Sequence, residues 1–300
     1  MANFNIYQTN TDRMIAEMEK GLIPWRKPWV VALTGVKIRG EIDLRKIAFN
    51  RITKRAYSML NQMLLGKAGE YASFKQWTEI GGKIKKGAKA DIVVFWTTFD
   101  KEVQDPQTGK KEIVKIPMLR YYNVFHISQV EGIKPLDFSD EKQKPHITFE
   151  PEIEAEEMAN AYLQREGISL DFGGDSAFYS PSGDYINVPS KESFRGNGAE
   201  FYSTLYHEII HSTGHKSRLD RLSKGAHFGN EEYSKEELVA EIGSARLLFY
   251  LGIETKSSFK NSTAYVQSWL RQLKSDNKFV ISAAGQAERA IDFIIGEFKA

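Results

Sequence analysis

The pattern of hydrophobic and polar positions predicts several helices early in the chain. Residues 8–20 place an apolar stripe on one helical face and are followed by Gly21, a common helix terminator. Residues 41–65 and 71–80 show helical patterns as well, and Ser73 is a suitable cap for the second of these segments. The first part of the chain is therefore expected to begin as a set of short helices.

Strand patterns follow these helices. A basic turn leads into the apolar run 92–96, which is typical of a strand. Residues 105–111 (DPQTGKK) have the composition of a hairpin tip, and residues 113–127 form the returning strand. We predict an α+β arrangement with a curved antiparallel sheet in this part.

The second part of the chain has longer helical patterns. Residues 152–165 are amphipathic, and two strands are expected around a turn at residues 181–184. Helical segments are predicted at 198–213 and 234–253, the second with Ser234 as its cap. The chain is thus expected to be α+β throughout.

A polar segment with three prolines and no periodicity separates the two parts. It predicts a basic domain at 1–135, a linker at 136–151 and a second domain at 152–300. Charge agrees with this division, because residues 1–135 hold 23 Lys and Arg against 13 Asp and Glu, whereas the remainder is acidic. The asymmetry indicates either a nucleic-acid partner or two solvated surfaces of unequal charge.

The composition is that of a globular protein, with 41% hydrophobic and 27% charged residues. The absence of cysteine excludes disulfides and thiolate metal ligands and fits a reducing cytoplasm. No apolar run approaches the length of a membrane span, so a cytoplasmic location is expected.

Aromatic and basic side chains alternate in the segment GLIPWRKPW, which contains Trp25, Arg26, Lys27 and Trp29. Bases of single-stranded DNA stack on aromatic rings while Lys and Arg meet the phosphates. The alternative is that these tryptophans are core anchors. Further candidate DNA contacts in the basic half are Arg51, Lys54, Arg55, Lys83, Lys85, Lys86 and Lys89.

The strongest chemical signal is the segment His207-Glu208-Ile209-Ile210-His211, which matches H-E-x-x-H. Two histidines four residues apart lie on one helical face and can share a metal ion. Glu208 is then placed to act as the general base. In zincin peptidases, a strand just before the metal-binding helix often lies beside the metal and pairs with an extended substrate. Residues 185–188 are in this position, and they are expected to form either such a strand or an ordinary sheet strand.

A catalytic zinc site needs a third protein ligand, which the following helix can supply. Glu237 and Glu241 are four residues apart and so lie on one face of that helix. We expect Glu237 to bind the metal and Glu241 to orient a ligand histidine; the alternative is that these two glutamates have the opposite roles. Glu236 is the less favoured neighbour. His215 comes too early for the H-E-x-x-H-x-x-G-x-x-H pattern, so we expect it either to hydrogen-bond a metal ligand or to lie at the rim of the pocket.

Longer motifs resemble one family. The segments TDRMIAEMEKGLIPWRKPW, FKQWTEIGGKIKKGAKADIVVFW and RYYNVFHISQVEGI are similar to the N-terminal domain of ArdC-type antirestriction proteins, which is shared with TraC-type plasmid primases. The segments YSTLYHEIIHSTGHKSRLDR and KEELVAEIGSARLL are similar to the zincin-like metallopeptidase domain of the same family. Together these matches extend over almost the whole chain.

The resemblance implies an antirestriction protein of a plasmid or phage that binds single-stranded DNA non-specifically and protects incoming DNA. It also implies a zincin-like peptidase domain with one divalent metal ion, where histidine and glutamate ligands suit zinc or manganese. A restriction enzyme or another DNA-bound protein is the expected substrate. The alternative is a non-catalytic DNA-binding protein whose metal is structural.

Overall fold

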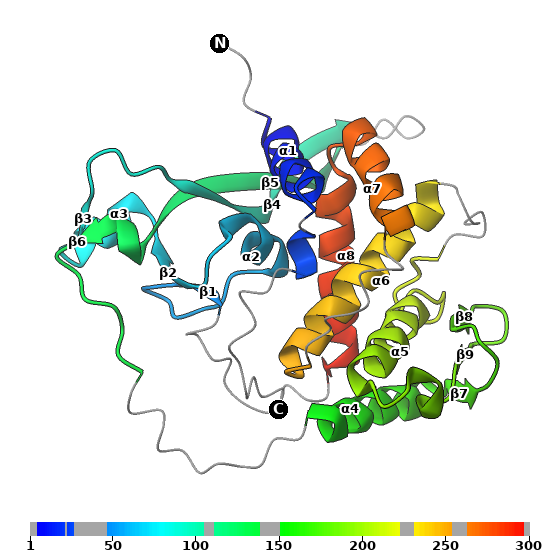
Figure 1. The fold of residues 1–300 in the computed structure, drawn as a ribbon. Helices are drawn as coiled ribbons and strands as arrows, with labels where there is room; N and C mark the ends of the chain where they lie inside the picture. The colour runs from blue at the N-terminus through cyan, green and yellow to red at the C-terminus, as the bar shows by residue number, and fades with distance from the viewer. Residues whose placement is uncertain are drawn as a thin grey trace.

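A computed structural model of the 300-residue chain has an α+β architecture, as the sequence predicts (Figure 1). One half carries a curved sheet, and the other half is a group of helices beside a small sheet. None of its described helices is long and apolar enough to cross a membrane. The structure describes residues 5–21, 23–26, 47–104, 111–138, 151–222, 231–253 and 263–296.

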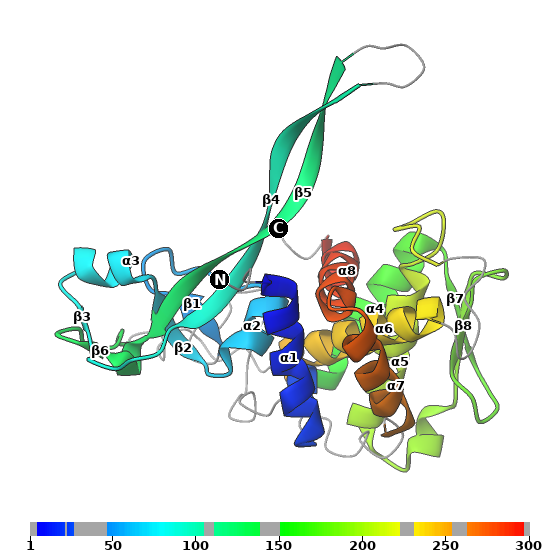
Figure 2. The ribbon, with the colours of Figure 1, turned by 90° about the horizontal axis from the view of Figure 1, so that it is seen from above.

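Four strands form the larger sheet, in the order β1 (Ala48–Asn50), β2 (Gly69–Ala72), β5 (Lys111–His126) and β4 (Asp91–Gln104). β1 and β2 are parallel, whereas β5 is antiparallel to both of its neighbours. All 14 residues of β4 pair with β5. These two strands extend beyond the rest of the sheet as a twisted ribbon, which we call the arm (Figure 2).

Short helices pack around this sheet. α2 (Met59–Leu65) lies against β4, where the Asn61 side-chain amide bonds both backbone groups of Val94 at 2.8 Å. α3 (Phe74–Glu79) begins with the expected Ser73 cap. A two-stranded sheet of β3 (Lys83–Ile84) and β6 (Val130–Glu131) follows, with the short helix η4 (Ile127–Gln129) before β6.

The helix predicted at 41–65 is wrong for most of its described length. Residues 48–50 are a strand that is buried on both faces and pairs with β2, and residues 51–58 form a turn and an extended segment. The Gln62 side chain bonds the backbone N–H and C=O of Ala48, at 2.8 and 2.7 Å. Tertiary pairing therefore outweighs the local helical pattern here, and residues 41–46 lie outside the described chain.

The other half contains α4 (Pro151–Glu166), α5 (Gly198–Ser212), α6 (Glu231–Tyr250), α7 (Thr263–Ser275) and α8 (Phe279–Ile294). A three-stranded sheet and the short helix η6 (Lys191–Phe194) precede α5. The strand order is β7 (Ser169–Phe172), β9 (Tyr185–Val188), β8 (Phe178–Ser180).

Two expectations for this half need correction. The sheet has a third strand, β7, because residues 169–172 pair in parallel with β9. Ser234 is not a helix cap, since α6 begins at Glu231 and Ser234 is buried inside the helix. The apolar periodicity gave no sign of this extra polar turn.

The N-terminal segment belongs to the core of the helical half. α1 (Ile6–Glu19) and η1 (Pro24–Arg26) pack on α6, α7 and α8, as the blue and orange helices of Figure 1 illustrate. The Trp25 ring meets the Trp269 ring edge-on, with centroids 5.6 Å apart. Thr11 Oγ1 donates to the carbonyl of Asn277 at 2.8 Å. One hydrophobic core thus continues from the first helix into the last.

Candidate metal centre

Close packing of α5 against α6 creates the candidate metal centre. α5 begins at an Asn197 cap and buries an apolar face that includes Leu205 and Ile209. On α6, a Cβ added to Gly243 would lie 2.7 Å from Ile210 Cδ1. Any larger residue at 243 would therefore force the Ile210 side chain to shift, so this glycine favours the close packing at which the polar side chains of the two helices meet.

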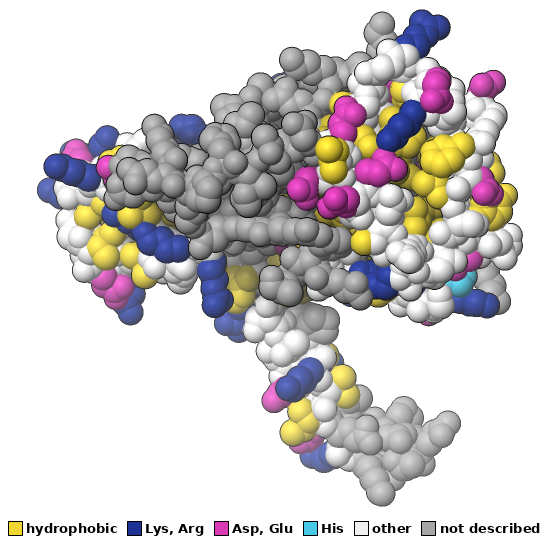
Figure 3. All heavy atoms as spheres, turned by 90° about the horizontal axis from the view of Figure 1, so that it is seen from below, with side chains coloured by type: hydrophobic (Ala, Val, Ile, Leu, Met, Phe, Trp, Pro, Cys, Tyr) yellow, Lys and Arg dark blue, Asp and Glu magenta, His cyan; other side chains and the backbone are white. Residues whose placement is uncertain are grey.

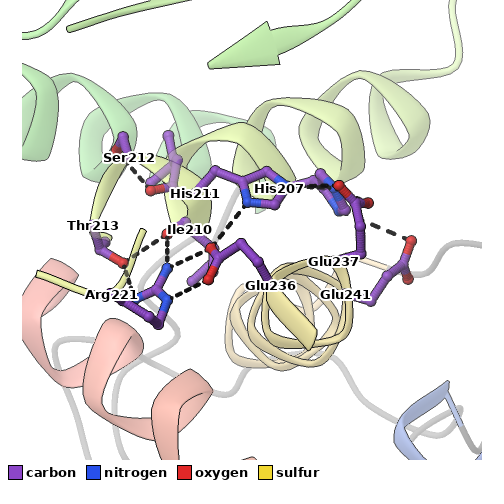
Figure 4. A network of polar contacts seen from close by, with 10 residues as sticks. His207, Ile210, His211, Ser212, Thr213, Arg221, Glu236, Glu237 and Glu241 are labelled. Atoms are coloured by element: carbon purple, nitrogen blue, oxygen red, sulfur yellow. Dashed lines mark hydrogen bonds and ion pairs between the residues drawn. The ribbon is translucent and has the colours of Figure 1, made fainter. Parts of the chain in front are cut away.

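His207, His211 and Glu237 converge across this helix pair (Figure 4). The two histidine Nε2 atoms are 3.1 Å apart, and each lies 3.5 Å from an oxygen of Glu237. Ligands about 2.1 Å from one tetrahedral ion are about 3.4 Å from one another. The three side chains therefore have the chemistry and spacing that a divalent metal ion requires.

Glu241 occupies a different position. Its Oε1 lies 3.9 Å from His207 Nδ1, on the side of the imidazole away from the shared centre. Nδ1 is the atom that an orienting carboxylate would approach. The geometry therefore favours Glu237 as the third ligand and Glu241 as a neighbour of His207.

Glu236 holds the second histidine. Its Oε1 lies 3.0 Å from His211 Nδ1, and both of its oxygens accept from the Arg221 guanidinium, at 2.7 and 2.8 Å. Arg221 also donates to the carbonyl of Ile210 and to Thr213 Oγ1, which fixes it to the end of α5 (Figure 4). With Nδ1–H donating to Glu236, Nε2 of His211 carries the free lone pair for a metal.

Sequence reasoning missed this support. Glu236 was the less favoured acid and Arg221 was not singled out. The pair Glu236–Glu237 was a usable signal, because adjacent helical residues project about 100° apart and can therefore serve different partners. No spacing rule could have indicated Arg221, which arrives through the turn after α5.

The cluster is strongly coupled electrostatically. Burial lowers the pKa of both histidines, but the neighbouring carboxylates outweigh it and raise the pKa of His207 and, further, of His211. Burial raises the pKa of Glu237, yet the two imidazoles bring it far below its ordinary value. The carboxylates thus favour positive charge at this centre, which a divalent cation can supply.

Glu208 and His215 lie outside the group of three. Glu208 follows His207 on α5 and is 7% exposed, and within the described residues its carboxylate has no hydrogen-bond or ion-pair partner. His215 lies in the turn after α5, with Nδ1 2.7 Å from Ser217 Oγ. That turn is held by Arg218, which pairs with Asp184 and donates to the Ser212 carbonyl at 2.7 Å.

β9 cannot accept an added substrate strand, contrary to one expectation. It is the central strand of its sheet, so Ile186 is already opposite Leu170 on one side and Tyr179 on the other. Strand addition requires a free edge. β9 is therefore an ordinary sheet strand.

The candidate DNA contacts are scattered over the sheet-bearing half. Lys83, Lys85, Lys86 and Lys89 are exposed around β3, and Lys54 and Arg55 are exposed in the turn after β1. Figure 3 shows Lys and Arg side chains over this half and the arm, while Asp and Glu gather on the helical half.

Other candidates are less accessible. Trp25 is only 7% exposed, which favours its role as a core anchor, and the Arg51 side chain is largely buried in an ion pair with Glu70. Arg26 lies in η1, and Lys27 and Trp29 lie outside the described residues.

The fold and this site define a two-part protein with a zincin-like metal-binding half. Residues 157–286 match the family described as zincin-like metallopeptidase, and residues 4–125 match the N-terminal domain of the anti-restriction factor ArdC. The chain aligns with the metal-free crystal structure of the antirestriction protein ArdC from plasmid R388, with 34% identity, a TM-score of 0.70, and coverage of 99% of this chain and 100% of that one. The chain belongs to the ArdC family of antirestriction proteins.

Other relatives agree. The Mn(II)-bound structure of the R388 protein has 32% identity and a TM-score of 0.72, with 99% of each chain covered. An uncharacterized protein of Sinorhizobium fredii, y4eC, is 30% identical over 97% of this chain and 91% of its own length. The DNA primase TraC of Escherichia coli is 32% identical over 95% of this chain, which spans only 26% of that primase.

Proposed function

We propose that this protein protects incoming DNA from restriction by binding single-stranded DNA through its sheet-bearing half, and that its helical half holds one divalent metal ion. The observation that carries the metal assignment is the convergence of His207, His211 and Glu237, with donor atoms 3.1 to 3.5 Å apart. Imidazole and carboxylate donors suit zinc and manganese alike. The DNA assignment is supported by the basic charge of residues 1–135 and by the family membership.

The metal centre is also suited to peptide hydrolysis. A bound divalent ion would supply Lewis-acid polarisation of a peptide carbonyl. Glu208, whose carboxylate has no hydrogen-bond or ion-pair partner among the described residues, would accept a proton from the attacking water and return it to the departing amine. Glu236 and Arg221 would keep His211 in the required tautomer and orientation. A protein encountered on DNA, such as a restriction enzyme, would be the substrate.

One observation favours a second function, in which the metal is structural and DNA binding alone protects. β9 has no free edge for an extended peptide, so this strand offers no pairing site for a substrate. In that case the His–Glu network would stabilise the helical half by holding α5 to α6.

The variant Glu208→Gln separates these functions. We expect it to retain stoichiometric metal, measured by inductively coupled plasma mass spectrometry, because Glu208 is not among the three converging donors. If hydrolysis is required, protection of transformed DNA from a restriction enzyme should fall to the level of a vector control. A matched lysine variant, Lys54→Ala with Arg55→Ala in the exposed turn after β1, should lose protection through weaker DNA binding.

Full protection by Glu208→Gln, together with loss in the lysine variant, would reject the peptidase and leave the binding function. Purified protein without bound divalent metal after dialysis against zinc and manganese would reject the metal assignment. Absence of single-stranded DNA binding by the wild-type protein would reject the DNA assignment.

A further inference from the structure

The arm has two chemically different faces. In an antiparallel pair, residues directly opposite each other project to the same face. Phe95 is opposite Arg120 and Phe99 is opposite Ile116, so these residues share a face with Tyr122, which we call the Phe95 face. Trp96, opposite Leu119, lies on the other side, which we call the Trp96 face.

The Phe95 face displays three accessible rings. Phe95, Phe99 and Tyr122 are 43%, 41% and 39% exposed. The rings of Phe95 and Tyr122 lie side by side, with centroids 5.8 Å apart. Large aromatic side chains are usually buried because their apolar surface is costly in water. A row of them on a protruding ribbon therefore indicates a binding surface.

Charge distinguishes the two faces. From the Val93–Tyr122 pair to the Lys101–Val114 pair, every residue of the Phe95 face is apolar, threonine or basic. Arg120 and Lys101 are both exposed there. On the Trp96 face, Asp100 is opposite Lys115, and Glu102 just beyond it forms an ion pair with Lys111, so the acidic side chains there are balanced by lysines. A polyanion is therefore attracted more strongly to the Phe95 face, where Arg120 and Lys101 face no acidic side chain in this stretch, than to the charge-balanced Trp96 face.

The faces also differ where they meet the body of the protein. On the Trp96 face, Val94 and Leu119 are buried in the core shared with α1 and α2. On the Phe95 face, the Tyr122 side chain lies close to the buried Tyr57, whose Oη accepts from Asn50 Nδ2 at 3.4 Å.

Asn50 begins the turn that carries the exposed side chains of Lys54 and Arg55. Its Oδ1 accepts from the backbone N–H groups of Ile52 and Thr53, both at 3.0 Å, which holds this turn against the sheet. Tyr122 is thus connected, through the buried Tyr57 and Asn50, to the turn that carries these two cations.

We infer that single-stranded DNA lies along the Phe95 face, with bases stacked on Phe95, Phe99 and Tyr122 and a phosphate held by Arg120. This inference rests on the proposed function and names the surface that performs it. Exposed rings accept any base, and basic side chains meet any phosphate, so binding here would show little sequence preference.

Fluorescence anisotropy with a labelled oligodeoxythymidylate tests the assignment. Phe95→Ala and Phe99→Ala should each weaken binding about tenfold, the range expected for loss of one base–ring stack. Arg120→Gln should lower the slope of log affinity against log salt by about one, because one phosphate contact is lost. An abasic oligonucleotide with the same number of phosphates should bind wild type and Phe95→Ala equally.

The matched control is Trp96→Ala, which removes an even more exposed ring, 52%, from the adjacent position of the same strand. It should change affinity less than twofold. Equal losses in Trp96→Ala and Phe95→Ala, or no loss in either, would overturn the face assignment while leaving DNA binding intact. A change of oligomeric state in Phe95→Ala with Phe99→Ala, with unchanged DNA affinity, would instead assign the face to contact with a second copy and overturn the inference.

Discussion

The candidate metal centre and the arm present their side chains in opposite ways. At the metal centre, residues from α5 and α6 converge on one point, and Glu236 and Arg221 hold His211 in place. On the arm, rings and cations point outward, and the ladder of paired strands supplies the framework. The first arrangement suits one small ion, and the second suits a long, variable polymer.

This difference determines what a substitution does. A buried network loses more than one interaction when one member is removed, because its partners are left unpaired. An exposed row loses contributions one ring at a time. Substitutions near the metal should therefore affect folding and metal together, whereas substitutions on the arm should affect DNA affinity alone.

Trp25→Ala should have the largest effect on stability, and it tests whether Trp25 acts in the core or in DNA binding. Its ring is buried against Trp269, so truncation should lower the free energy of unfolding by about 3–5 kcal/mol. Urea denaturation followed by circular dichroism measures this. Trp96→Ala, in which an exposed ring is removed, should stay within about 0.5 kcal/mol of wild type. A stable Trp25→Ala protein with weak DNA binding would place Trp25 functionally with the arm instead.

Glu236→Ala should have the next largest effect. Loss of a carboxylate that orients a metal-binding histidine commonly weakens metal affinity by about 10–100-fold, and isothermal titration with zinc or manganese would measure it. DNA affinity should not change. Glu232→Ala, on an exposed position of the same helix, is the control and should bind metal normally. Unchanged metal affinity in Glu236→Ala would show that the ligands need no such support.

Asp184→Asn should have the smallest effect, with a characteristic pH dependence. Burial raises the pKa of Asp184, but hydrogen bonds from Arg218 and Tyr179 outweigh it and lower the pKa below the ordinary 3.8. The ionised carboxylate therefore stabilises the folded state above that pH, and this stabilisation is lost as the pH falls through the lowered pKa.

We expect Asp184→Asn to lower the free energy of unfolding by about 1–2 kcal/mol at neutral pH. This difference in the free energy of unfolding between variant and wild type, the stability gap, should shrink below about pH 4. Urea denaturation at several pH values measures both. Asp171→Asn on the exposed surface of β7 is the control and should give no gap. A gap that is constant down to the lowest pH would contradict the assigned ion pair.

Sequence patterns served well where interactions are local. The spacing of His207 and His211, the α5 helix and the Ser73 cap all depend on residues a few positions apart, and each agrees with the structure. The third donor was narrowed to two acids by the same helical spacing. The family motifs lie along almost the whole chain, and they indicate its two halves.

Non-local contacts limited the rest. The sequence predicts helix at residues 48–50, because the pairing of β1 with β2 is not visible in these residues themselves. The position of β9 between two strands depends on β7, which has no clear alternation of its own. The burial of Trp25 depends on Trp269, from the opposite end of the chain. In each case the deciding partner is brought in by topology.

The docking of α1 onto α7 has a consequence for how the protein is made. Thr11 bonds Asn277, 266 residues further along the chain, so the first helix cannot reach its final position until most of the polypeptide has left the ribosome. At about 5–20 residues per second, the apolar face of α1 must wait tens of seconds for its partners. Nascent chains should therefore be targets for chaperones during that interval, and synonymous codons that slow translation before α7 should lower the soluble yield.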